Sequence, residues 1–364
     1  MNISISNTGV SGVRSSISNT GGSGVSSSFS NTGGSGVNSI ISSTGVSVVT
    51  SSVNTTVFIG VRSRISVTGG NGVSSSISNT DVSGLSSSIS NTAGCVATSS
   101  IRSTGANEVS SSISYTGCGG VSSNFSNICV SGFVISICNS GGSDVSRNIS
   151  NTGDNGVTSE ISNTGCSADS SSISITEVSG VSISIFYTGG SGVSSRFSNT
   201  GGCRVMCSIS NTGGSGVSSC IKNNVGRGFS CKMSNPGGSR FSSRINNNGG
   251  RGVSSSISNT CVNGFSSSLS FTGVSGVSSS ISITAGNGVS SNISNTGGSG
   301  VSCSFSNSGG SGVRIITSNT VVSGVSSSIN NTDVSGINSI IIYTGVCGVI
   351  SSISNTGGSG VSSI

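Results

Sequence analysis

The side chains that most often perform catalysis are scarce in this chain. His is absent, and eight Asp and Glu residues are scattered through 364 residues. Without imidazole, the Ser–His and Cys–His nucleophile pairs cannot form, and paired-carboxylate chemistry has few candidates. Serine is abundant, but the sequence places no activating base beside any one of the hydroxyls. We therefore expect a non-enzyme with no catalytic residue, no cofactor and no small-molecule substrate.

Cysteine and glycine do not indicate a metal or phosphate site. The twelve Cys residues lack CxxC spacing and have no His beside them, so we expect no zinc site. The glycine runs lack both the Lys of a phosphate-binding loop and the regular Asp of a calcium-binding β-roll. If the compartment is oxidising, the candidate disulfides are Cys203 with Cys207 and Cys220 with Cys231. The thiols do not identify the compartment.

Basic residues are concentrated in one stretch of the chain. No acidic residue occurs between Glu177 and Asp333, whereas this interval contains a cluster of eight cations: Arg196, Arg204, Lys222, Arg227, Lys232, Arg240, Arg244 and Arg251. Such a cluster favours contact with a polyanion or an acidic surface. The alternative is an ordinary solvated face or a variant of the repeat that was duplicated locally.

These residues are set in a repeat that fills nearly the whole chain. Thirty consecutive blocks of twelve residues run from Ile5 to Ile364 with the consensus Ile-Ser-Asn-Thr-Gly-Gly/Val-Ser-Gly-Val-Ser-Ser-Ser, and residues 1–4 form a short lead. A short fixed period indicates stacked units, each of which needs neighbours to bury its apolar residues. We therefore expect residues 5–364 to form one continuous array.

Alternation within a block predicts a strand. The ninth, eleventh, first and third positions share one parity and accept apolar substitutes such as Ile135, Val67 and Tyr115, so they should face inward. The third position, usually Asn, should form amide ladders between stacked coils. Arg147 and Asp169 share the inward parity. Because an unpaired buried charge is strongly disfavoured, we expect them to mark loosened coils.

The predicted fold is all-β, a single narrow β-solenoid of about thirty 12-residue coils. Five turn residues cannot return a straight strand to its start, so each block should bend into two short sides. On such a coil, Arg196, Lys232 and Arg244 would form one row, and four further cations would line the turn: Arg204, Arg227, Arg240 and Arg251. The alternatives are an antiparallel β meander and a disordered or aggregating low-complexity chain, since only 6% of residues are charged.

The hydroxyl rows of this predicted coil support a resemblance. Outward Ser at the twelfth and second positions and Thr at the fourth would repeat along a flat side, which is similar to the ice-binding faces of short-coil solenoid antifreeze proteins. The stretch from Asn319 to Gly324 resembles a grass ice-recrystallisation repeat. The resemblance implies ice binding, but on 12-residue coils six cations would interrupt the plane: Arg64, Arg102, Arg196, Lys222, Lys232 and Arg244.

These observations favour a structural or adhesive repeat rod. Ice binding is the first alternative, and the second is a translated tandem DNA repeat without a selected function. Coils without distinct caps would expose strand edges, so we expect self-association through the ends. No secretory signal is visible in residues 1–9, and no apolar run is long enough to span a membrane. Cell-surface or extracellular localisation would rest on analogy alone.

Overall fold

The computed structural model describes residues 2–363 except 10–11, 47, 70–71, 83, 93–95, 106–107, 118, 129–131, 142–143, 154–155, 166–167, 178–179, 190, 203, 214, 238–239, 261–262, 358 and 360. The fold is all-β, with 93% of the structure in strands. The strands are β1 (Asn2–Thr8), β2 (Val13–Gly22), β3 (Val25–Val46), β4 (Val48–Thr68), β5 (Gly72–Val82), β6 (Leu85–Thr92), β7 (Val96–Thr104), β8 (Glu108–Thr116), β9 (Gly120–Ile128), β10 (Gly132–Ser140), β11 (Asp144–Thr152), β12 (Val157–Thr164), β13 (Ala168–Thr176), β14 (Gly180–Thr188), β15 (Ser191–Gly202), β16 (Arg204–Thr212), β17 (Ser215–Pro236), β18 (Phe241–Thr260), β19 (Asn263–Thr344), β20 (Cys347–Thr356) and β21 (Val361–Ser363).

Strand pairing follows a single rule. Described partners are parallel, and each residue pairs with the same position of the second block along the chain: Ile89 pairs with Ile113, which in turn pairs with Ile137. The same offset begins in β1, where Asn2 pairs with Ser26, so residues 2–4 already belong to a strand. Stacked parallel strands of this kind form a β-solenoid, which confirms the predicted fold class. The antiparallel meander is wrong, because its neighbouring strands would run in opposite directions.

The predicted coil length is wrong by a factor of two. The register partners Asn199 and Asn223 are 24 residues apart, so one coil contains two blocks, and there are about half as many coils as the thirty predicted. A block does not bend into two short sides. Each forms one straight strand, and its turn has only to cross to an opposed sheet about 10 Å away. The next block then returns along that sheet, which solves the return problem that a single block could not.

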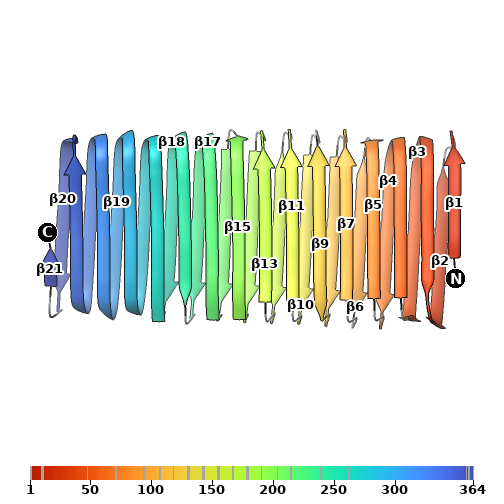
Figure 1. Ribbon diagram of the computed structural model, residues 1–364, viewed down its shortest axis with the longest axis horizontal. Coiled ribbons are helices and arrows are strands. Elements are labelled where there is room, and N and C mark those ends of the chain that lie inside the picture. Colours follow the sequence, from red (N-terminus) through yellow and green to blue (C-terminus); the bar gives the residue numbers. More distant parts are fainter. Residues whose placement is uncertain are drawn as a thin grey trace. The chain divides into compact units, whose positions relative to one another are not determined.

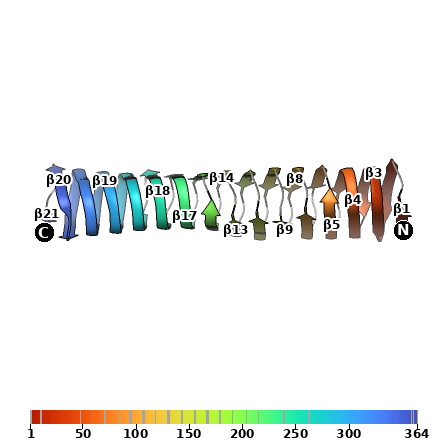
Figure 2. The ribbon, with the colours of Figure 1, turned by 90° about the horizontal axis from the view of Figure 1, so that it is seen from above.

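The contacts divide the chain into two units, Met1–Ile183 and Ser184–Ile364. Within each unit, alternate blocks form two opposed layers joined by the turns (Figure 1 and Figure 2). In the first unit, layer A contains β1, the first parts of β3 and β4, and β5, β7, β9, β11 and β13. Layer B contains β2, the second parts of β3 and β4, and β6, β8, β10 and β12.

The second unit is built in the same way. Its layer C contains β15, the first parts of β17 and β18, and residues 265–272 of β19. Layer D contains β16, the second parts of β17 and β18, and residues 277–284 of β19. The 82-residue strand β19 goes on alternating between the two layers, and its residues 323–332 pair with β20.

The core lies between the layers and confirms the predicted parity. Val67, Tyr115 and Ile135 are all buried, as are the consensus Ile and Val residues beside them. The predicted amide ladders also form in the second unit: Asn199 Nδ2 donates to Asn223 Oδ1 at 2.8 Å, and Asn223 Nδ2 donates to Asn247 Oδ1 at 2.7 Å. Each ladder satisfies polar groups that would otherwise be costly to bury.

The fifth position of the block explains why Gly is preferred in the turn. Gly165 adopts φ 65°, a left-handed conformation that side chains disfavour. Glu177 and Asp333 occupy the same position of their blocks and adopt φ 57° and 53°. At these two corners the left-handed conformation is kept without glycine.

Candidate functional site

A regular field of hydroxyls lies on layer D. We call it the serine lattice and define it as the outward residues of four successive segments: Ser254, Ser256, Ser258, Thr260, Ser278, Ser280, Ser282, Thr284, Ser302, Ser304, Ser306, Ser308, Ser326, Ser328, Asn330 and Thr332. Asn330 is the one member that lacks a hydroxyl. None of the sixteen is charged.

Regular spacing follows from the sheet beneath the lattice. Ser254, Ser256 and Ser258 pair in register with residues 278, 280 and 282. Lattice neighbours are therefore about 4.8 Å apart between strands and about 6.6 Å apart along a strand. Ser280 Oγ donates to Ser256 Oγ at 3.5 Å, so adjacent rows can hydrogen bond to one another. The alternate residues of these segments are buried, which anchors each strand beneath its hydroxyls.

Charges are sorted between layers, which the 12-residue coil did not predict. The six cations expected to interrupt one plane lie on four layers: Arg64 on B, Arg102 on A, Lys232 on D before the lattice begins, and Arg196, Lys222 and Arg244 on C. In the first unit, the described strand faces of layer A carry two charged outward residues, Arg102 and Asp144. The described strand faces of layer B carry five charged outward residues: Arg14, Arg62, Arg64, Glu108 and Glu160.

The structure separates the basic cluster that the sequence analysis identified at residues 196–251. Arg196 and Arg244 lie on layer C in one row with Cys220 between them, and Lys222 is the next outward residue of that middle strand. Lys232 lies on layer D, so the predicted row of Arg196, Lys232 and Arg244 is wrong. Alternate blocks face opposite sides of a two-block coil, and this is why the row divides.

The four turn residues of the cluster are divided as well. Arg204 is exposed at the start of β16, and Arg240 is exposed just before β18. Arg227 and Arg251 are register partners at the corner between layers C and D, although the side chain of Arg227 lies outside the described set. Contact with a polyanion at this segment stays a prediction.

The two inward charges form a buried ion pair. Arg147 Nη1 lies 3.2 Å from Asp169 Oδ2, and both side chains are fully buried. Arg147 Nη2 donates to Asn163 Oδ1 at 2.5 Å across the core, and Asn163 Nδ2 donates to Asp169. Ser171 Oγ donates to the other carboxylate oxygen at 3.2 Å. The inward placement was predicted, but the expectation of unpaired charges is wrong, because the adjacent strands β11 and β13 bring the two residues together.

The cysteine pairing considered from the sequence is also wrong where the structure describes it. Cys231 points into the core of layer D and pairs in register with Cys207, whereas Cys220 is half-buried on the outward side of layer C. The hydrogen bond between the thiols of Cys207 and Cys231 raises the pKa of Cys231, and burial and the charge of Cys207 raise it further. Both thiols are free, and Cys203 lies outside the described residues.

Another buried thiol lies below the serine lattice. Burial raises the pKa of Cys303 from 9.0 to about 11, and a hydrogen bond from Asn295 Nδ2, 3.9 Å from the sulfur, partly opposes this shift. Such a thiol is protonated at neutral pH and is a poor nucleophile.

Apolar inward positions become accessible in β20. Val349 and Ile353 are 41% and 39% exposed, although they pair in register with the buried Val325 and Ile329. Self-association through such a surface stays a prediction.

Neither a metal-binding cluster nor a membrane-spanning helix occurs among the described residues. No group of three or more Cys, Asp or Glu residues in that set is arranged to hold a metal ion. The same part of the chain contains no helix with the length and apolar character needed to cross a membrane.

Sequence reasoning missed the separation of the surfaces, although the sequence contains a signal for it. Unusual residues recur two blocks apart: Cys207 with Cys231 and Phe241 with Phe265, whose rings stack with centroids 5.8 Å apart. Substitutions shared between every second block are thus a signal of the two-block coil, although Phe229 and Phe241 recur one block apart.

Comparison with known proteins gives no family: no protein-family model, curated protein or solved structure matches this chain.

Proposed function

We propose that the chain is a non-enzymatic structural protein that adheres to neutral, hydroxyl-rich surfaces through its serine lattice. One observation carries the proposal: the lattice repeats hydroxyls over four successive segments without a charged side chain. A hydroxyl both donates and accepts hydrogen bonds, so a regular array of them complements another regular array of hydroxyls. The sheet holds the array in place, which lowers the entropy cost of binding.

Adsorption to microcrystalline cellulose tests this proposal. The variant Ser282→Lys with Ser304→Lys places two charges in the middle of the lattice, at residues that are exposed and outward. We expect its adsorption to fall to background, because each ammonium must be desolvated against a neutral surface. Adsorption of the unmodified protein should change little with NaCl, since no charges take part.

A matched control carries the same added charge on another layer. Ser242→Lys with Ser266→Lys changes two exposed, outward residues of layer C. We expect this variant to adsorb like the unmodified protein. Equal losses in both variants, or no adsorption by the unmodified protein, would refute the adhesive role.

Ice binding is the second candidate, and the sorting of charges favours it. The six cations that would interrupt the plane of a 12-residue coil all lie outside the lattice, which supports this candidate. The test is thermal hysteresis and inhibition of ice recrystallisation, measured on the same two variants. Loss of activity in the lattice variant alone would support ice as the partner, and inactivity of the unmodified protein would exclude it. If both cellulose and ice fail, the interpretation without a selected function gains support.

A further inference from the structure

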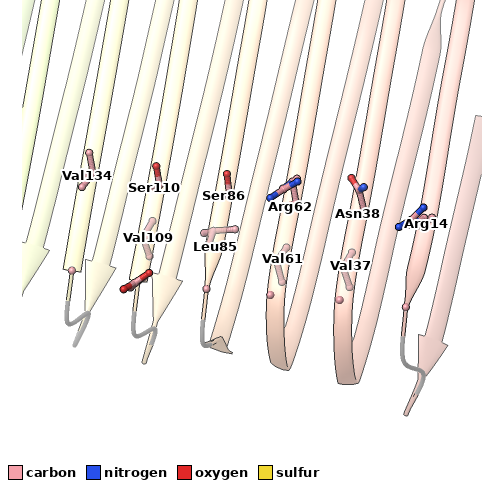
Figure 3. A pocket seen from close by; sticks show the side chains of 16 residues that line it. Arg14, Val37, Asn38, Val61, Arg62, Leu85, Ser86, Val109, Ser110 and Val134 are labelled. Carbon is pink, nitrogen blue, oxygen red and sulfur yellow. The ribbon is translucent and has the colours of Figure 1, made fainter.

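A groove in the first unit lies on layer B and shares no residue with the serine lattice. It has a volume of about 690 Å³ and crosses six successive layer B segments, from Gly12 to Val134. Glycines at the eighth position, such as Gly60 and Gly84, leave space beside the strand ends, and the buried Val61 and Leu85 line the bottom (Figure 3). The result is a channel that runs across the strands.

Cations lie on one wall of this groove. Arg14, Asn38 and Arg62 occupy the same position on three successive strands and project side by side (Figure 3). The two arginines are thus two strand spacings apart, roughly 9.6 Å at about 4.8 Å each. Both are exposed, and neither has an ion-pair partner among the described residues. Farther along the wall, Ser86 and Ser110 take the same position, and Glu108 is the one acid that lines the described groove.

We propose that this groove binds a single chain of an acidic polysaccharide. The planar guanidinium of Arg matches a carboxylate with two parallel hydrogen bonds. A sugar unit in an extended polysaccharide is about as long as one strand spacing, so carboxylates on alternate sugars meet Arg14 and Arg62. The amide of Asn38 and the hydroxyls of Ser86 and Ser110 face the hydroxyls of the sugars. The apolar floor packs against the C–H faces of the rings.

The spacing and composition of the groove favour a polysaccharide over a nucleic acid. Duplex DNA carries one charge per about 1.7 Å, far denser than two cations roughly 9.6 Å apart. Single-stranded nucleic acids are usually bound by aromatic side chains that stack on the bases, and no aromatic residue lines the described groove. The proposal does not depend on adhesion through the serine lattice, because the two surfaces share no residue.

The test is binding of polygalacturonate, measured by isothermal titration calorimetry. The variant Arg14→Ser with Arg62→Ser places in the groove the residue that Ser86 and Ser110 already provide at the same position, so the fold should be retained. We expect binding roughly tenfold weaker, from the loss of two exposed charge pairs. The control Arg196→Ser with Arg244→Ser removes the same charge from layer C and should bind normally.

A second variant tests the channel itself. Gly84 has no left-handed backbone, and a Cβ added there meets no atom within 4 Å. Glu108 already occupies the equivalent position, so Gly84→Glu should fold while placing a second acid in the groove. We expect polygalacturonate binding to be lost and the circular dichroism spectrum to be unchanged.

Several outcomes would overturn the proposal. They are a lack of binding by the unmodified protein, equal losses in the two arginine variants, and unchanged binding by Gly84→Glu. Binding of neutral dextran as tight as that of polygalacturonate would remove the role of charge. Tighter binding of a single-stranded oligonucleotide, weakened by the same variants, would assign the groove to nucleic acid instead. Cellulose adsorption by these variants should stay normal, which separates this result from failure of the serine lattice.

Discussion

At the scale of single residues, the buried pair Arg147 and Asp169 shows how the repeat tolerates a charge. Each alone would be an uncompensated charge in an apolar core. Together with Asn163 and Ser171 they form a hydrogen-bonded network, and all of these groups come from three consecutive strands, β11 to β13. Arg147 replaces the consensus Ser and Asp169 replaces the consensus Val. Each of these two departures from the consensus therefore depends on the other.

We predict that breaking this pair is costly and that removing it completely is not. Asp169→Val leaves Arg147 without its carboxylate and should destabilise the local coils by about 3–5 kcal/mol. Arg147→Ser with Asp169→Val should return to within about 1 kcal/mol of the unmodified protein or exceed it. Val145 and Ser171, the register partners of the replaced residues, show that the new residues fit.

Native-state hydrogen exchange of amides in β11 to β13 measures these changes. Additive losses in the single and double variants would show that Arg147 and Asp169 do not stabilise each other. Exchange in these strands of the unmodified protein as slow as in consensus coils would agree with a satisfied pair.

The buried thiol of Cys303 predicts a loss of stability at high pH. Its pKa in the folded protein is raised to about 11, so the unfolded chain, with a thiol near 9.0, loses its proton first. The stability that Cys303 contributes is complete below pH 9 and is lost as the pH rises through about 11. Cys303→Ser should reduce this dependence, and Ser279 occupies the same inward position one coil earlier. Urea unfolding at pH 8 and pH 10.5 measures the effect, and identical pH dependence in the two proteins would contradict it.

At the scale of elements, strands and their buried faces could be predicted because parity is a local property. Tyr115, which replaces a consensus Asn, faces inward whichever strand is its neighbour. The alternation of side chains therefore identified the core although the coil length was unknown. The coil length could not be read in the same way. The two halves of a coil carry the same consensus. The sequence therefore has a period of twelve residues whether a coil contains one strand or two.

The Asn ladder offers a prediction at this scale, with a control in the next residue. Asn223 is buried and bonds to Asn199 on one side and Asn247 on the other, whereas Asn224 faces outward and accepts one bond of 3.4 Å from Asn248. Asn223→Ala should cost about 1–3 kcal/mol, because its partners remain buried without it. Asn224→Ala should cost less than about 0.5 kcal/mol. Urea denaturation compares the two, and similar midpoints would contradict a stabilising ladder.

At the scale of the molecule, the two-block coil decides which residues share a surface. Adjacent blocks face away from each other, so the cations of residues 196–251 are dispersed, whereas Arg14 and Arg62 become near neighbours although their blocks are far apart in the sequence. The sequence shows where the cations are but not which of them share a layer. Sharing a layer depends on whether two residues are separated by an even number of blocks, and this matters only once the coil is known to contain two blocks. Insertion of a single block would exchange the faces of every block that follows.

Spin labels can test the coil length directly. Ser112, Asn124 and Ser136 are exposed and occupy the same position in three consecutive blocks. In a variant with Ser at the native Cys positions, labels on Ser112→Cys and Ser136→Cys should couple strongly, since these residues are register partners. Labels on Ser112→Cys and Asn124→Cys project from opposite sides of two sheets about 10 Å apart and should couple weakly. Stronger coupling in the second pair would restore the 12-residue coil.

The buried amide ladders give the second unit an electric polarity. In each of the five described bonds between buried or half-buried ladder amides, the donor precedes the acceptor by one coil: Asn199 to Asn223, Asn223 to Asn247, Asn211 to Asn235, Asn295 to Asn319, and Asn331 to Asn355. Their side-chain dipoles therefore add along the stacking direction, as peptide dipoles add along a helix. A row of identical asparagines therefore distinguishes one direction of the stack from the other.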